Sequence, residues 1–158
     1  MPDFIGSILV FSVVLSIFLF SWNSVQINQQ KFDDEENLRK DAYYTTTFLV
    51  STPGYPSDWD SDNVQIPGFT SESDNVISTD KLREFRNITL ERQKRLLGVE
   101  NFYLRFNNET GVIKLDSENL SFGKEPVNAS TAIPINRQVL ISKPGNMMDA
   151  QMRYVVWE

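Results

Sequence analysis

Residues 4–22 read FIGSILVFSVVLSIFLFSW, an apolar stretch without a single charged side chain. As a helix rising about 1.5 Å per residue, it would be about 28 Å long, close to the hydrocarbon thickness of a bilayer of about 30 Å. No later part of the chain is comparably apolar. We therefore predict one membrane-inserted helix followed by a polar head, with residues 1–22 as the transmembrane or filament-core segment.

The flanks of this stretch do not match a cleaved secretory signal, which has a basic region before the apolar stretch and small residues at a cleavage site. Residues 1–3 contain no Lys or Arg, and residues 21–24 contain no Ala-x-Ala sequence. We expect the helix to remain in the working protein. The alternative is a buried helix of a soluble protein, although few such helices are this long and free of charge.

Small residues within the stretch suggest contacts between helices. Ser12 and Ser16 lie four residues apart on one helix face, and Gly6 lies between one and two turns before Ser12. Small side chains let two helices approach closely within lipid, so these three positions are candidate helix-packing residues. In the alternative reading, each serine hydroxyl bonds to its own helix backbone and faces lipid.

The helix is predicted to continue beyond the membrane as an amphipathic stem over residues 23–50. This segment contains no Gly or Pro, and apolar residues recur at helix-like spacing at Val25, Phe32, Leu38, Ala42 and Leu49. A helix from residue 4 to residue 50 would be about 70 Å long, and the Pro and Gly residues at 53–56 would end it. The alternative is a break in a short polar linker near residues 23–30.

The composition of the head, residues 51–158, excludes several classes of function. The chain has a net charge of −6 and no basic stripe, which argues against nucleic acid as a partner. It has no His and no Cys, so a Ser-His-Asp triad and disulfides are excluded. Carboxylate pairs such as Asp58/Asp60 or Asp33/Glu36 lie in a predicted loop or on a solvated helix face. We therefore predict no enzyme activity and no cofactor.

The pattern of the head predicts an α+β fold, with a small antiparallel β-sheet. Two short helices are expected, one beginning after Ser78 or Thr79 and one over Thr89–Leu97, with Gly98 as its C-terminal cap. Alternation and turn residues predict two hairpins. Their strands are Phe102–Phe106 with Val112–Leu115, and Ala132–Ser142 with Met152–Trp157, the latter joined by a reversal at Lys143–Asn146.

Alternating carboxylates within the predicted loop of residues 51–77 resemble part of a calcium site. Asp58, Asp60 and Asp62 could place oxygen atoms around Ca²⁺. The full EF-hand pattern fails, because Asn63 replaces the required Gly. A solvated turn is the simpler interpretation, in which Tyr55 and Trp59 attach the loop to the head.

Four Asn-x-Ser/Thr sequons in the head favour an extracytoplasmic location. Their acceptor residues are Asn87, Asn108, Asn119 and Asn128, and Asn108 is expected at the tip of the first hairpin, where a glycan would fit. All Lys and Arg residues follow the apolar stretch, so a strict positive-inside count would instead place the head in the cytoplasm. We expect a single-pass membrane protein with its head outside the cell, or an extracellular filament.

Several segments resemble archaeal type IV pilin-like surface proteins. They are residues 49–59 (LVSTPGYPSDW), 78–82 (STDKL), 137–141 (RQVLI) and 154–157 (YVVW). An apolar N-terminal helix that continues into an amphipathic stem and a β-rich head is also similar to the pilin architecture. The resemblance implies a lollipop-like subunit that assembles through its apolar helix and carries a glycosylated head facing outward.

The resemblance leaves two functions open. One is a structural subunit or minor component of a type IV pilus-like assembly, with other copies or pilin-like subunits and the membrane as partners. The other is a single-pass membrane-anchored protein whose head binds a surface partner without polymerising. Pilin precursors carry a basic leader before the apolar helix, and none precedes Pro2 here. We expect that such a leader has been removed or that the chain is an uncleaved anchor.

Overall fold

The computed structural model describes residues 2–70, 73–143 and 145–157. Helix α1 (Pro2–Ser51) is continuous over 50 residues, so the predicted helix through residues 4–50 is confirmed and a break near residues 23–30 is wrong. The chain divides into two compact units, Met1–Asn37 and Leu38–Glu158. The second, which we call the head unit, begins before residue 51 because it includes the last turns of α1.

The end of α1 follows from its local sequence. Thr46 and Thr47 are β-branched, yet their hydroxyls donate to the carbonyl oxygen of Tyr43, at 2.9 and 2.7 Å. Both the amide and the hydroxyl of Thr52 donate to the Phe48 carbonyl oxygen. Pro53 has no amide hydrogen with which to continue the ladder, so the helix ends at Ser51.

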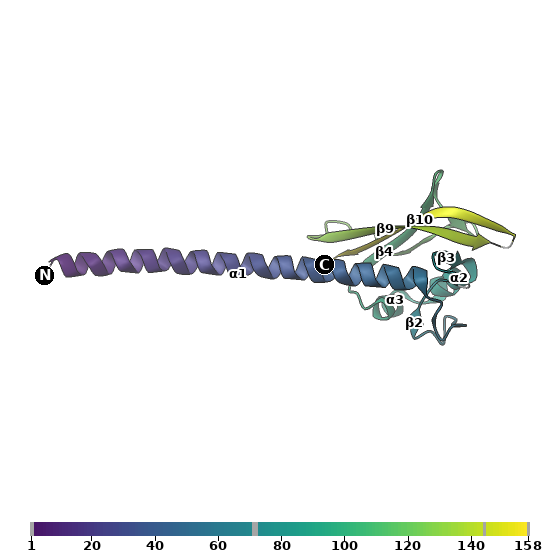
Figure 1. Ribbon diagram of the computed structural model, residues 1–158, viewed down its shortest axis with the longest axis horizontal. Coiled ribbons are helices and arrows are strands. Elements are labelled where there is room, and N and C mark those ends of the chain that lie inside the picture. Colours follow the sequence, from purple (N-terminus) through teal and green to yellow (C-terminus); the bar gives the residue numbers. More distant parts are fainter. Residues whose placement is uncertain (1, 71–72, 144, 158) are drawn as a thin grey trace. The chain divides into compact units, whose positions relative to one another are not determined.

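A mixed sheet forms one layer of the head unit (Figure 1). In the described part of the chain it has six strands, in the order β3-β9-β10-β4-β5, with β8 also paired to β4. Their bounds are β3 Val76–Ser78, β4 Phe102–Asn108, β5 Gly111–Val112, β8 Ser121–Gly123, β9 Ala132–Lys143 and β10 Asn146–Trp157. Strand β3 runs parallel to β9. The predicted small antiparallel sheet is therefore wrong in its size and in the direction of one strand.

The two longest strands, β9 and β10, form a hairpin with an unbroken register from Ala132↔Trp157 to Lys143↔Asn146. The second strand thus begins at Asn146, earlier than the predicted Met152. Pro144, part of the predicted reversal, lies outside the described residues. β10 also pairs with β4, so it lies inside the sheet.

The predicted hairpin of Phe102–Phe106 with Val112–Leu115 is only partly correct. β4 and β5 pair at Asn107↔Val112 and Asn108↔Gly111. Lys114–Leu115 instead forms β6, which pairs with β7 (Glu118–Asn119). Asp116 and Ser117 connect β6 to β7 with φ angles of 55° and 73°, the conformation that a tight two-residue hairpin turn requires. A third pairing, β1 (Gly54–Tyr55) with β2 (Ile66–Pro67), closes the loop that follows α1.

The two short helices form where the sequence predicts them. Helix α2 (Thr79–Asn87) is capped by Ser78, whose side chain accepts from the Lys81 amide. Helix α3 (Leu90–Leu97) begins after Thr89 and ends at Gly98, whose φ of 68° is left-handed. Both helices and the last turns of α1 lie on one side of the sheet (Figure 1).

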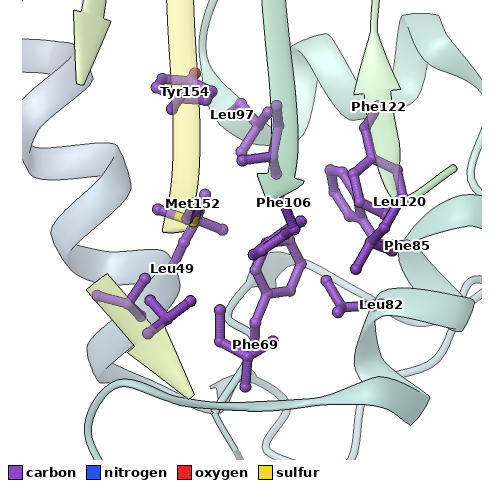
Figure 2. Packing of buried hydrophobic residues seen from close by; sticks show 14 of the residues in the cluster. Leu49, Phe69, Leu82, Phe85, Leu97, Phe106, Leu120, Phe122, Met152 and Tyr154 are labelled. Atoms are coloured by element: carbon purple, nitrogen blue, oxygen red, sulfur yellow. The ribbon is translucent and has the colours of Figure 1, made fainter. Parts of the chain in front are cut away.

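The core of the head unit lies between these helices and the inner face of the sheet (Figure 2). Phe85 from α2 contacts Phe69 and Phe122 edge to face, with ring centres 5.3 and 5.2 Å apart. Leu49 brings the end of α1 into the same core. Each fully buried large side chain contributes about 1.5–3 kcal/mol, so this cluster is the main source of the head unit's stability.

Candidate functional site: an exposed apolar helix and a polar head

The apolar segment of α1 is exposed on all sides. Its large apolar side chains between Phe4 and Trp22 are from 43 % exposed, at Leu15, to 77 % exposed, at Phe20. The most apolar window of the helix has a mean hydropathy of 2.5 and none of it is buried. A helix that is apolar all round belongs in lipid or in a bundle of other helices. Among the described residues, this one helix is long and apolar enough to span a membrane.

The candidate helix-packing residues are small but do not offer free hydroxyl donors. Ser12 donates to the Ile8 carbonyl oxygen at 2.8 Å, and Ser16 donates to that of Ser12 at 2.8 Å. A Cβ atom added at Gly6 would have open space around it. The three positions can therefore contribute close approach of a second helix, while the two serine hydroxyls are not available as donors to that helix in this conformation.

The predicted calcium ligands are not brought together as a metal site. The Asp60 carboxylate accepts from the amides of Asp62 and Asn63, at 2.9 and 3.0 Å, and so stabilises a turn. These backbone hydrogen bonds hold the pKa of Asp60 below its ordinary value of 3.8. In residues 2–70, 73–143 and 145–157, no three acidic side chains lie close enough together to hold a metal ion.

The positively charged side chain of Arg92 lies against backbone carbonyl oxygens of the acidic loop, which we define as residues 56–65. The Arg92 guanidinium donates to the carbonyl oxygens of Ser61, Asp62 and Val64, at 2.6, 2.9 and 3.4 Å. The Ser61 amide in turn donates to the Glu84 carboxylate, at 3.0 Å. Helices α2 and α3 thus hold the loop through charged side chains, a role that the sequence did not indicate.

Trp59 attaches the start of this loop to the head, as predicted. It is buried, and its indole nitrogen donates to the carbonyl oxygens of Pro53 and Gly68, at 2.9 and 3.0 Å. The Lys81 ammonium lies 4.7 Å from the centre of its ring and donates to the Ser57 carbonyl oxygen. Tyr55 was expected to share this role, but its side chain is 59 % exposed.

The four sequons lie in different local structures. Asn87, Asn119 and Asn128 are exposed, at the end of α2, in β7 and in the loop before β9. Asn108 is half-buried in β4, and its side-chain oxygen accepts from both the amide and the hydroxyl of Thr110, at 3.0 and 2.8 Å. Its side-chain nitrogen faces the Met148 sulfur. Asn108 is therefore less accessible than predicted for a residue at the tip of a hairpin.

One apolar groove of about 270 Å³ lies on the head unit, between the last turns of α1, β2 and α3. It is lined by Tyr44, Thr45, Phe48, Leu49, Ile66, Pro67, Leu96 and Leu97. Its walls offer apolar contact and no charged group.

Comparison of the chain with protein-family models, with curated proteins and with solved structures gave no match.

Proposed function

We propose that this chain is a structural subunit or minor component of a type IV pilus-like surface assembly. In this proposal the apolar segment of α1 packs against neighbouring subunits, and the head lies outside the cell. The observation that carries the proposal is the exposure of the whole apolar surface between Phe4 and Trp22.

This surface requires an apolar partner because leaving it in water is costly. Burying one large apolar side chain contributes about 1.5–3 kcal/mol, and many such side chains surround the segment. Lipid satisfies this requirement in the membrane, and helices of other subunits satisfy it in a filament core. The continuity of α1 into the buried Leu49 supports a subunit in which the assembling helix and the head core share one element.

The exposed sequons support an outward-facing head. Asn87, Asn119 and Asn128 present their side chains at the surface. The described residues of the head unit also form a core without disulfides, which suits either side of a membrane. The proposed location therefore rests on the sequons.

The proposal is tested by electron microscopy of surface material sheared from native cells, with mass spectrometry of the filaments. Peptides from residues 81–158 in helical filaments would support an assembly subunit. Full-length chain found only in the membrane fraction, without filaments, would contradict it.

Matched substitutions sharpen this test. At about 100° per residue, Val14 lies on the opposite face of α1 from Ser12 and Ser16. We expect Ser12→Leu with Ser16→Leu to reduce filament yield, because bulk separates the packed helices, and Val14→Leu to leave it unchanged. All of these variants should still insert in the membrane, since each becomes more apolar or remains so. Equal effects on both faces would remove the role of the two serines.

The back-bonded serines favour a second candidate, a membrane-anchored head that does not polymerise. With their hydroxyls bonded within the helix, Ser12 and Ser16 face lipid at little cost. In that case the head alone carries the function, as a binding module for a surface partner.

A further inference from the structure

Three rows of side chains cross the outer face of the sheet, opposite the face that packs on the helices. Residues paired directly across neighbouring strands share a face, so the register defines each row. From β9 through β10 and β4, the rows are Pro134-Val155-Tyr103, Asn136-Arg153-Arg105 and Gln138-Gln151-Asn107. Rows two residues apart lie about 7 Å from one another. An apolar row, in which Val155 is buried, a row with two cations and an amide row therefore lie side by side on this face.

The middle row places two positive charges next to each other. Arg105 on β4 is directly opposite Arg153 on β10, and Cβ atoms of such a pair are about 5 Å apart. Like charges in this position destabilise a sheet unless something compensates them. Among the described residues, no carboxylate lies within 4.0 Å of either guanidinium.

Arg105 also has an unused hydrogen-bond donor. Its Nε atom is buried and has no hydrogen-bond partner in the described part of the chain. A buried donor without a partner costs about 1–3 kcal/mol, more for a charged group. The guanidinium lies 6.0 Å from the ring centre of Tyr103, which orients it without satisfying that donor. The Arg105 side chain hydrogen-bonds to that of Tyr103, yet its Nε atom has no partner and no described carboxylate pairs with either arginine.

The carboxylate of Glu125 interacts with Tyr103 and not with the arginine pair. Burial, and then the hydrogen bond to Glu125, raise the pKa of the Tyr103 hydroxyl above 10.0. Glu125 therefore acts on Tyr103, and it forms no ion pair with Arg105 or Arg153 within 4.0 Å.

We propose that this outer face binds an acidic polysaccharide, with a carboxylate or sulfate of the sugar held between Arg105 and Arg153. Guanidinium groups bind planar oxyanions with two parallel hydrogen bonds, which suits either group. The amides of Gln138, Gln151 and Asn107 both donate and accept, as sugar hydroxyls require. This site is independent of filament formation.

The aromatic ring of Tyr103 beside the arginine pair, and the position of that pair within the sheet, favour a sugar over a peptide. The half-buried Tyr103 provides an aromatic surface beside the charges, on which the apolar face of a sugar ring can lie, whereas Val155 is buried. An acidic peptide strand would instead pair with a sheet edge through its backbone, whereas these rows lie across the middle of β10 and β4.

The test is calorimetric titration of the full chain in detergent micelles with polygalacturonate and with dextran sulfate, at about 50 mM salt, where Lys and Arg contacts are weakly screened. Uncharged dextran is the ligand control. We expect both acidic polymers to bind and dextran not to bind. Arg153→Gln, at an exposed position, should weaken binding at least tenfold, equivalent to about 1.4 kcal/mol. The double variant with Arg105→Gln should abolish it.

Arg95→Gln with Lys114→Gln is the matched control, because it removes two exposed positive charges elsewhere on the head. We expect it to bind like the unmodified chain. An equal loss in this control would show binding to net charge and overturn the proposal. Equal affinity for polyglutamate would identify an acidic peptide instead, and equal affinity for inorganic sulfate would leave only a small-anion site. Absence of binding by the unmodified chain, with its melting temperature intact, would also overturn it.

Discussion

The guanidinium of Arg137 on β9 lies over the ring of Tyr43 on α1, with its Cζ atom 4.5 Å from the ring centre. The same group donates to the hydroxyl of Thr47 and, at 3.4 Å, to the carbonyl oxygen of Tyr43. Its Nε atom also donates to the Thr46 hydroxyl, at 3.4 Å, so one side chain of the sheet contacts four groups on the last turns of the helix. This contact links α1 to the sheet within the head unit through charge rather than through apolar packing alone.

Arg137→Ala is expected to lower the free energy of unfolding of the head unit by about 2 kcal/mol, since a cation–π contact and hydrogen bonds from a charged group are lost. Urea titration of the full chain in detergent, followed by tryptophan fluorescence, measures it. Gln138→Ala, at the exposed neighbouring position, is the control and should stay within about 0.5 kcal/mol. A loss of the same size in both variants would contradict a specific role for Arg137.

Arg92→Gln is expected to release the acidic loop and to destabilise the head unit by about 1–3 kcal/mol, because the carbonyl oxygens of Ser61, Asp62 and Val64 lose their charged donor. Hydrogen exchange of the amides in residues 56–65 should accelerate. Arg95→Gln, an exposed substitution on the same helix, should change neither quantity. Unchanged exchange in Arg92→Gln would show that Trp59 and Lys81 suffice to hold the loop.

Calcium is expected to leave the stability of the unmodified chain unchanged. A ligand that binds only the folded state raises the melting temperature. In this chain the Asp60 carboxylate accepts backbone amides, and Arg92 already lies on the loop carbonyl oxygens. Thermal melts with millimolar Ca²⁺, and with Mg²⁺ as the control ion, measure this. A rise of the melting temperature with Ca²⁺ alone would restore Asp58, Asp60 and Asp62 as ligands.

The stability of the head unit is expected to fall in acid partly through Asp60. Its pKa in the folded state is below the ordinary 3.8, so the folded state binds this proton less readily than the unfolded chain. The resulting stabilisation is present above about pH 4 and is lost as the pH falls through the lowered pKa. Asp60→Asn keeps an oxygen acceptor but cannot titrate. The drop in melting temperature between pH 6 and pH 3 should therefore be smaller in the variant than in the unmodified chain, and equal drops would contradict the assignment.

If the head is extracytoplasmic, sugar is expected on one or more of Asn87, Asn119 and Asn128, and not on Asn108. The first three side chains are exposed, whereas the Asn108 amide is engaged by Thr110 and faces Met148. Glycopeptide mass spectrometry of the chain from its native cells checks this, with Asn119→Gln as a control for site assignment. Full occupancy of Asn108 would contradict the accessibility argument.

The elements that were predicted correctly have strong local signals. The long helix contains no Gly or Pro from residue 7 to its end, and Pro53 follows it. Gly98, with its left-handed φ, ends α3. Trp59 was correctly assigned to the loop attachment because a large aromatic side chain in a polar loop usually finds a place to bury. Such signals depend on a few neighbouring residues, and sequence reasoning reads them directly.

The errors arise where pairing partners are distant in sequence or strands are very short. Val76–Ser78 is too short to show alternation, and its parallel partner, Leu140–Ser142, lies more than 60 residues later. The turn at Asp116 and Ser117 contains no Gly, so its hairpin was missed. Arg105 and Arg153 each look like an ordinary exposed residue of an alternating strand. Only the register of β4 with β10 brings them together.

The unbroken register of β9 with β10 constrains how the gene for this protein can vary. Because side chains alternate between the two faces, inserting or deleting one residue within either strand would turn Arg153 toward the core and Tyr154 toward water. Substitutions on the outer face leave that alternation intact. Related chains should therefore diverge in the hairpin by substitution, or by changes of two residues at a time, while its length parity stays constant.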